Sequence, residues 1–343
     1  MSYSDMERFN DALKGRPRDR VPILPLNALW VAVNFPDHVF TEVANDPKLV
    51  FDAQIWAKEL LGYDWLDPHV DPLYIPEAFG CNVRFPETGP LVDPFPIPFS
   101  SLKDVERLPV PDFKKVARLP VILETTRLMN EYAKGSVPVL APFEGPFTTA
   151  CRILDAEVVM RMIYKAPKIL EALLDKITEF LVAFGCALIE SGANVALIPE
   201  PSASSSVISP SIFARFVVPR LRKLTANLPV PCVLHICGNT LPILAAMGQS
   251  GADVLSLDQC MNLAEARIAY REAVFGGNVD PINALLMGDT EKVEKDTLRC
   301  LRTGGATHFM LMTGCAVPPN TPLENLKAMI KTVIAYESET ALD

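Results

Sequence analysis

A histidine and a cysteine lie two residues apart in the stretch VPCVLHICGNT, where a short apolar run ends. The chain has only 4 histidines, so the pairing of His235 with Cys237 is unusual. Side chains two apart on a strand point to the same face, and Gly238 allows a sharp turn directly after them. We therefore expect this pair to supply two ligands to a metal ion at the end of a strand.

A third candidate ligand is Cys315, in LMTGCAVPPNTP, which follows another predicted strand. Zinc binds cysteine sulfur and histidine nitrogen in a tetrahedral set, and catalytic zinc sites keep one position open or weakly held. Two cysteine ligands give the ion excess donor charge, which suits activation of a thiol better than activation of water. A thiol bound in this way loses its proton. Asp258 ends a neighbouring predicted strand and is a candidate fourth ligand.

A simpler interpretation is that these cysteines are small buried apolar side chains. A single His-x-Cys pair is weak support for a metal site, and Cys232 on the same strand needs no function. The remaining histidines, His38, His69 and His308, have no obvious partners in the sequence. The 8 cysteines are Cys81, Cys151, Cys186, Cys232, Cys237, Cys260, Cys300 and Cys315. The metal hypothesis depends on the placement of three ligand types at predicted strand ends.

Short apolar runs alternate with longer helical patterns along the chain, which predicts parallel βαβ units. Eight strands, each followed by a helix, would close a (β/α)8 TIM barrel of the α/β class. We expect one domain over residues 1–343, with its active site at the carboxyl ends of the strands. The predicted strands are 21–25, 62–66, 137–141, 194–199, 232–236, 253–257, 273–278 and 307–313.

Residues 68–111 interrupt the alternation of predicted strands and helices, because they are rich in proline and lack a helical period. The segment is too long for an ordinary connection between a strand and a helix. Its position predicts an insertion after strand 2 that lies over the mouth of the barrel. The alternative is a surface excursion that only packs against the barrel.

Composition excludes several classes of partner. The 343 residues are 49% hydrophobic and 21% charged, with a net charge of −9 and no long run of Lys or Arg. Binding to nucleic acid or to an anionic membrane surface is therefore not expected. The N-terminus is polar, and no stretch approaches the roughly 18 apolar residues of a membrane span. We expect a cytoplasmic protein that acts on a small molecule.

Several motifs resemble one enzyme family over nearly the whole chain. HICGNT, FGGNVDP and TGCAVPPNTPLENLKAM, after the opening MERFNDALKGRPRDRVPILP, resemble the uroporphyrinogen decarboxylase superfamily. More specifically, they resemble its corrinoid:thiol branch, typified by the methylcobamide:coenzyme M methyltransferases. The resemblance implies a TIM barrel with zinc at its mouth, held by His235, Cys237 and Cys315. It also makes Asp258 the match for an acidic fourth ligand.

The same resemblance implies the reaction and its partners. A methyl group would pass between a corrinoid, in the form of methylcobalamin, and a small-molecule acceptor. The corrinoid would be carried by a separate corrinoid protein, which a partner methyltransferase would supply with methyl groups.

Four further residues are candidates for substrate binding. Glu144 and Glu200 follow the third and fourth predicted strands, and they would orient the acceptor, support the zinc ligands or simply cap the loops. Glu200 stands where the family usually has Asp. The resemblance marks Asn278 and Asp280, in GGNVDP, as pocket residues, although a turn built by Asn, Asp and Pro explains them equally well.

Three classes of function remain open from the sequence. The first is a zinc-dependent methyltransferase whose acceptor is a thiol such as coenzyme M, or a non-thiol such as tetrahydrofolate. The second is a metal-free decarboxylase, and the third is a corrinoid or tetrapyrrole binder without activity. Decarboxylation of a polycarboxylate tetrapyrrole is disfavoured because no arginine occurs between Arg20 and Arg84. Only the first class gives a reason for His235, Cys237 and Cys315.

Overall fold

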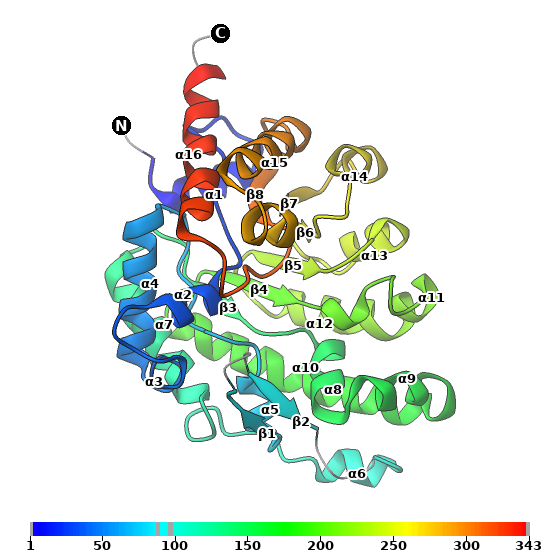
Figure 1. Ribbon diagram of the computed structural model, residues 1–343. Helices are drawn as coiled ribbons and strands as arrows, with labels where there is room; N and C mark the ends of the chain where they lie inside the picture. The colour runs from blue at the N-terminus through cyan, green and yellow to red at the C-terminus, as the bar shows by residue number, and fades with distance from the viewer. Residues whose placement is uncertain (1–2, 87–89, 95–98, 341–343) are drawn as a thin grey trace.

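The computed structural model describes residues 3–86, 90–94 and 99–340. Its main sheet has six parallel strands in chain order, from β3 to β8 (Figure 1). The strands of this sheet are β3 (Leu140–Pro142), β4 (Val195–Pro199), β5 (Cys232–Ile236), β6 (Val254–Leu257), β7 (Val274–Val279) and β8 (Phe309–Thr313). The predicted strand 232–236 coincides with β5, and the other five predicted ranges each overlap their strand.

Two short segments close the sheet into a barrel. Ile23 forms a parallel bridge to Leu311 of β8, and Leu66 forms one to Val139, directly before β3. The two segments are joined to each other by the backbone N–H of Asp64, which donates to the carbonyl of Ile23 at 2.8 Å. The hydrogen-bonded segments therefore form a closed ring, and the predicted (β/α)8 barrel is confirmed.

The first two predicted strands, 21–25 and 62–66, are reduced to these single bridges. Pro22 and Pro25 lack a backbone N–H, so they limit the hydrogen bonding of the first segment. Gly62 ends the preceding helix in a left-handed conformation with φ of 85°, so the second segment becomes extended only after it. The prediction was right about the number of segments and wrong about their length.

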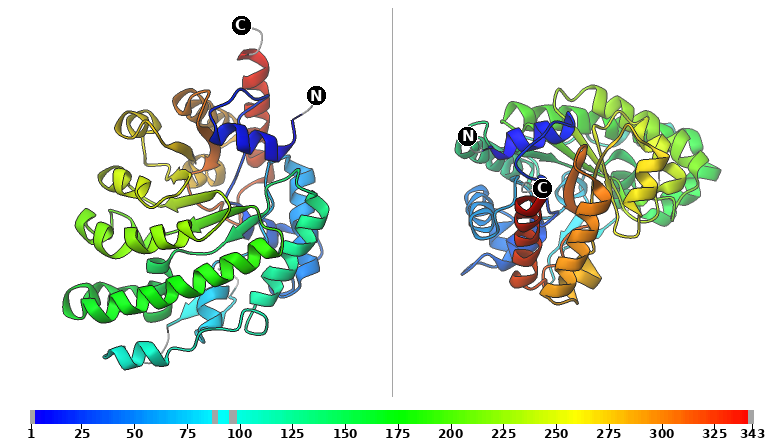
Figure 2. Two further views of the ribbon diagram at one scale, coloured as in Figure 1. Left: turned by 180° about the vertical axis from the view of Figure 1, so that it is seen from behind. Right: turned by 90° about the horizontal axis from the view of Figure 1, so that it is seen from above.

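A helix follows each of the eight segments, and these helices surround the strands (Figure 2). They are α4 (Pro47–Leu61), α7 (Leu119–Ala133), α10 (Pro167–Glu190), α12 (Val218–Ala226), α13 (Leu244–Gly248), α14 (Leu263–Ala269), α15 (Thr290–Gly304) and α16 (Leu323–Thr340). Within the described ranges, no helix combines the length and apolar character needed to cross a membrane.

Further helices occupy the connections between these elements. They are α1 (Asp5–Leu13), α2 (Ala28–Asn34), α3 (Phe40–Val43), α5 (Tyr74–Ala78), α6 (Leu102–Arg107), α8 (Pro146–Leu154), α9 (Ala156–Lys165), α11 (Pro210–Ile212), η1 (Pro201–Ala203), η2 (Phe213–Val217), η3 (Leu241–Ile243) and η4 (Pro281–Leu286). The helix α8 begins directly after the loop that leaves β3, so it lies at the carboxyl end of the barrel.

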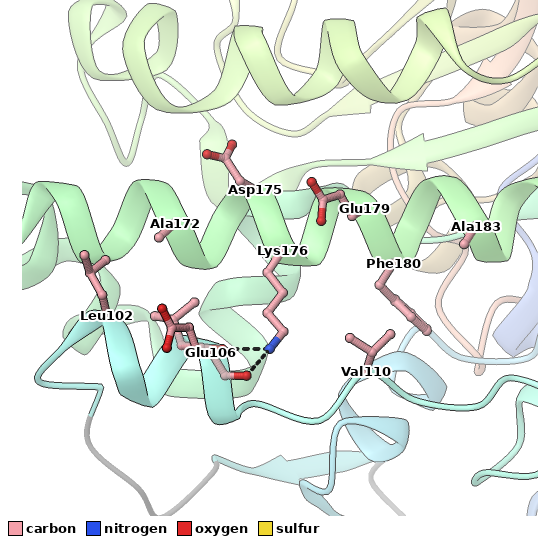
Figure 3. Close-up of a pocket in the computed structure, with 10 residues that line it drawn as sticks. Leu102, Glu106, Val110, Ala172, Asp175, Lys176, Glu179, Phe180 and Ala183 are labelled. Atoms are coloured by element: carbon pink, nitrogen blue, oxygen red, sulfur yellow. Dashed lines mark hydrogen bonds between the residues drawn. The ribbon is translucent and has the colours of Figure 1, made fainter.

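The proline-rich segment 68–111 contains an antiparallel hairpin, β1 (Asn82–Arg84) and β2 (Leu91–Asp93), followed by α6. The helix α6 packs on the outer helix α10, where the Lys176 ammonium donates to the carbonyls of Val105 and Glu106, both at 2.8 Å (Figure 3). A groove of about 770 Å³ lies between α6 and α10. This end of the segment therefore lies on the outside of the barrel, whereas its first residues line the cavity described below.

A buried ion pair joins the two short segments that close the barrel. The Asp64 side chain is 1% exposed and accepts two hydrogen bonds from Arg20, at 2.5 and 2.6 Å. The same carboxylate accepts the backbone N–H of Ile23 at 2.7 Å. Asp64 therefore pairs with the Arg20 guanidinium and accepts the Ile23 amide at the point where the barrel closes.

We expect Asp64→Asn to lower the free energy of unfolding by about 3 kcal/mol, because it leaves Arg20 without its carboxylate in a buried place. Urea unfolding at neutral pH measures the change. The matched control is Asp93→Asn, which breaks the exposed pair between Arg84 and Asp93 and is expected to leave the free energy of unfolding almost unchanged. Equal small losses in the two variants would contradict a role for Asp64 in barrel closure.

Candidate metal centre

Three potential metal ligands meet where β5 and β8 end. The Cys237 sulfur lies 3.3 Å from Nε2 of His235 and 3.4 Å from the Cys315 sulfur. The ligand atoms of all three residues lie within 4.8 Å of one another. His235 is the penultimate residue of β5, and the two cysteines lie on the loops just beyond β5 and β8. The structure thus brings together the three side chains that the sequence analysis singled out.

The surroundings of His235 fix which of its nitrogens can bind a metal. Its Nδ1 atom lies 3.0 Å from the hydroxyl of Ser256, the residue that pairs with His235 across β5 and β6. The Nε2 atom is therefore the one that faces the two sulfur atoms. A hydrogen bond at the other ring nitrogen is the usual way in which a protein orients a histidine ligand.

The turn after Cys237 is equally constrained. Gly238 has a φ of 78°, and a Cβ atom there would lie 2.8 Å from the Ser204 hydroxyl oxygen. Only glycine adopts this conformation without strain. Gly238 is therefore required after Cys237 for two reasons. Its backbone is left-handed, and it lies close to the loop after β4.

The residues fit a tetrahedral zinc ion. Zinc–sulfur and zinc–nitrogen bonds of about 2.3 and 2.0 Å place two sulfur ligands roughly 3.8 Å apart, and sulfur and nitrogen ligands roughly 3.5 Å apart. The separations of 3.4 and 3.3 Å in the structure are a few tenths of an ångström shorter. A small outward movement of the side chains would therefore accommodate the ion, and the donor set of two sulfurs and one imidazole is one that zinc prefers.

The two thiols share their protons unequally. A hydrogen bond from the Cys237 thiol lowers the pKa of Cys315 to about 4, despite the opposing effect of burial. The same hydrogen bond, together with burial, raises the pKa of Cys237. Binding of a cation to the two sulfurs would displace the proton that this hydrogen bond holds.

Asp258 lies near this group but is not one of the residues whose ligand atoms are within 4.8 Å of one another. Its carboxylate accepts the backbone N–H of Gly238 at 2.8 Å and that of Cys260 at 2.9 Å. Both oxygen atoms are thus already engaged in holding the loops. The assignment of Asp258 as a fourth ligand stays a prediction, and in this geometry the residue supports the turn that carries Cys237.

A cavity of about 350 Å³ lies beside the three ligands, and its lining comes from the carboxyl ends of several barrel segments. His235, Cys237 and Cys315 form one part of its wall. The other residues of the lining are Leu26, Ala28, Leu29, Asp67, His69, Val70, Asp71, Pro72, Glu144, Arg152, Leu197, Pro199, Pro201 and Ala316. A side chain that binds a metal in such a cavity has access to a small ligand.

Two ion pairs line the cavity, and the sequence analysis recognised only one of their four members. Glu144, which was predicted, accepts hydrogen bonds from Arg152 on α8 at 3.0 and 3.2 Å. His69 was left without a partner, but its Nδ1 atom contacts the Asp67 carboxylate. Asp67 and His69 directly follow the second predicted strand, at the end of the barrel where active sites lie, so their position could have marked them as candidates.

Glu200 does not belong to the cavity lining. It is fully buried, and its carboxylate accepts the backbone N–H groups of Phe147 at 2.8 Å and Thr148 at 3.0 Å, in the first turn of α8. Burial raises its pKa to about 7, although the two backbone N–H groups oppose the shift. This geometry supports the capping interpretation of Glu200, and the predicted contact with substrate gains no support from it.

Asn278 and Asp280 also lie outside the cavity lining. The buried Asn278 amide donates to the carbonyls of Asp258 at 2.9 Å and Met261 at 2.7 Å, so it supports the loop after β6. Asp280 begins η4 and accepts the backbone N–H groups of Ile282 and Asn283. Both residues have structural partners in this geometry, and the predicted roles in substrate binding gain no support from it.

Comparison with known proteins supports the resemblance over nearly the whole chain. The uroporphyrinogen decarboxylase (URO-D) family model matches residues 4–336. The methylcobamide:CoM methyltransferase MtaA of Methanosarcina barkeri is 31% identical over 331 residues, which cover 94% of this chain and 95% of that protein. The uroporphyrinogen decarboxylase of Geotalea daltonii is 29% identical over 343 residues, which cover 95% of this chain and 97% of that protein.

A solved structure agrees with these sequence comparisons. A methyltransferase from Methanosarcina mazei superposes with a TM-score of 0.87 at 29% identity, covering 99% of this chain and all of that one. The predicted enzyme class, a methyltransferase, is confirmed by these relatives. The chain belongs to the uroporphyrinogen decarboxylase family, and within it to the branch of the methylcobamide:CoM methyltransferases.

Proposed function

We propose that this chain is a zinc-dependent methyltransferase that moves a methyl group between a corrinoid and a thiol such as coenzyme M. The observation that carries the proposal is the group of His235, Cys237 and Cys315 in the wall of a cavity, with their ligand atoms within 4.8 Å of one another. Methyltransferases named for methylcobamide and CoM are similar over almost the full chain, which supports the same pair of substrates here.

His235, Cys237 and Cys315 would hold the ion, and Ser256 fixes the histidine ring through its hydrogen bond at 3.0 Å. Zinc held there would supply the Lewis acidity that makes an acceptor thiol nucleophilic at neutral pH. Methyl transfer to the thiol would form a carbon–sulfur bond and break the cobalt–carbon bond, whose electron pair would remain on cobalt. Transfer in the opposite direction uses the same atoms.

The corrinoid is expected to remain outside the cavity. A cavity of about 350 Å³ is at the small end of the range for ligand sites, and a corrinoid is much larger than this. We therefore propose that a separate corrinoid protein docks at the barrel mouth and is supplied with methyl groups by a partner methyltransferase. A single domain over 1–343, with part of the insertion 68–111 at this contact, belongs to the same proposal.

The small cavity also bears on the alternatives. A short thiol fits this volume better than a folate does. Among the described lining residues, Arg152 is the only arginine, and it is already paired with Glu144. A porphyrinogen with many carboxylates would need several such cations. The similarity to uroporphyrinogen decarboxylases therefore supports the fold more than it supports decarboxylation.

Metal content is the first test. We expect purified protein to hold about one zinc ion per chain, and both Cys237→Ala and Cys315→Ala to lose it, because two ligands cannot retain the ion tightly. Elemental analysis measures the content, and Cys186→Ala on α10 is the matched control that should keep it. A folded wild-type chain that takes up no zinc, even when incubated with the metal, would exclude the proposal.

Ser256→Ala is expected to weaken zinc binding by about 10- to 100-fold, because the imidazole of His235 loses the partner that orients it. Competition with a chromophoric chelator measures the affinity. Ser191→Ala removes a comparable hydroxyl hydrogen bond at the end of α10 and should leave the affinity unchanged. An unchanged affinity in Ser256→Ala would show that the hydrogen bond is not needed to orient the ligand.

Methyl transfer tests the reaction itself. We expect the zinc-loaded protein to demethylate methylcobalamin in the presence of a small thiol, and Cys237→Ala to reduce kcat/KM by roughly 100-fold or more, because the activating ion is lost. The absorbance change from methylcobalamin to cobalamin follows the reaction. Full activity in Cys237→Ala would instead favour a metal-free mechanism.

A further inference from the structure

A short turn after β6 lies between the two loops that carry the cysteine ligands. This β6 turn comprises residues 258–261, and it is closed by the backbone N–H of Met261, which donates to the carbonyl of Asp258 at 3.0 Å. The turn follows directly from the strand that carries Ser256, the partner of His235. It is therefore continuous with the element that orients the histidine ligand.

On one side, the β6 turn holds the chain that follows Cys237. The Asp258 carboxylate accepts the backbone N–H of Gly238 at 2.8 Å. At the other end of the turn, the sulfur of Met261 accepts the backbone N–H of Thr240 at 3.2 Å. The first and third residues after this cysteine are thus both held by the β6 turn.

On the other side, the β6 turn lies against Gly314, which directly precedes Cys315. A Cβ atom at Gly314 would lie 2.4 Å from the backbone nitrogen of Gln259, so the two segments approach as closely as only a glycine allows. The N–H of Gly314 also donates to the carbonyl of Val279 at the end of β7, at 2.8 Å. Because the β6 turn contacts both cysteine loops, a displacement of this turn would move both ligands.

One buried side chain holds the β6 turn at both of its ends. Asn278 is the penultimate residue of β7 and is 0% exposed. Its amide nitrogen donates to the carbonyl of Asp258 at 2.9 Å and to that of Met261 at 2.7 Å, the first and last residues of the turn. A primary amide has two N–H donors, and both are used for this purpose.

The orientation of this amide is set by Arg299, on the outer helix α15. The guanidinium donates to the side-chain oxygen of Asn278 at 3.3 Å and to its backbone carbonyl at 3.2 Å. Arg299 is itself held by the carboxylate of Asp296, at 2.7 Å. A reversed amide would place its oxygen against two carbonyls and its N–H groups against a guanidinium. Only one orientation therefore satisfies all the partners.

We propose that Asn278 is a positioning residue for the metal centre and that Arg299 orients it. Asn278 acts through the β6 turn, which keeps the loops of Cys237 and Cys315 at the separation that one ion requires. The GGNVDP motif then serves the metal ligands rather than the substrate. The inference rests on the proposed function, because it takes His235 and the two cysteines as a metal site.

Asn278→Asp tests the inference, because it keeps the shape of the side chain and replaces the two N–H donors with an oxygen. We expect the zinc affinity of the full-length protein to fall by about 10- to 100-fold, the loss typical of groups that support a metal ligand. Competition with a chromophoric chelator measures the affinity. Cobalt(II) in place of zinc gives a second readout, because its visible absorption bands depend on ligand geometry and should shift and weaken in the variant.

The matched control is Asn325→Asp. Asn325 is also buried, and its amide nitrogen donates to the carbonyls of Leu285 and Gly288, both at 2.8 Å, in a connection that carries no candidate ligand. Thermal unfolding should show that the two variants are destabilised to a similar degree. The zinc affinity and the cobalt bands of Asn325→Asp should nevertheless remain those of the wild type.

A second variant, Arg299→Gln, keeps both donors of Asn278 and removes only the group that orients them. We expect it to reduce zinc affinity by about 10-fold, at the lower end of the range for supporting groups. If Asn278→Asp does not fold, Arg299→Gln tests the inference by itself.

Wild-type zinc affinity in both Asn278→Asp and Arg299→Gln would overturn the inference. An equal loss of affinity in Asn325→Asp would also overturn it, because the effect would then follow from stability alone. A folded wild-type protein that binds no zinc refutes the proposed function, and the inference with it. A wild type that binds zinc, beside variants that bind it equally well, refutes only the roles of Asn278 and Arg299.

Discussion

Closure of the barrel is the constraint on which the candidate site depends. β5 and β8 are three positions apart in the sheet, so in a flat sheet their ends would lie about 14 Å from each other. The sulfur atoms of Cys237 and Cys315 are 3.4 Å apart. Such an approach requires a sheet that curves back on itself, with loops that turn inward at its carboxyl end. The short bridges of Ile23 to Leu311 and of Leu66 to Val139 complete that curvature.

The neighbouring strand then determines the chemistry of the metal ligands. β6 carries Ser256 opposite His235, so the imidazole presents Nε2 to the two sulfurs. Asp258, two residues further along the chain, receives the backbone N–H of Gly238 and steadies the turn after Cys237. One strand thus orients one ligand and holds the loop of another, which is how a protein keeps several ligands within a fraction of an ångström of the required geometry.

The cavity wall combines the three candidate metal ligands with two ion pairs. The sulfur and nitrogen ligands are of the soft type that zinc prefers. Asp67 with His69 and Glu144 with Arg152 form two pairs in which the basic group is the more exposed partner. Each buried carboxylate has a basic partner at hydrogen-bond distance, which offsets the cost of burying its charge. The net charge of −9 for the whole chain gives no indication of these local pairs.

Features that depend on local spacing could be predicted from the amino-acid sequence. Alternating apolar runs and helical patterns predicted the barrel, and the two-residue spacing of His235 and Cys237 placed them together because strand side chains alternate between faces. Which distant groups meet became clear only from the packed fold. It paired Arg152 of α8 with Glu144, and it seated Glu200 at the start of the same helix rather than in the cavity. Such contacts depend on how loops and helices pack after the barrel closes, and no period along the chain encodes them.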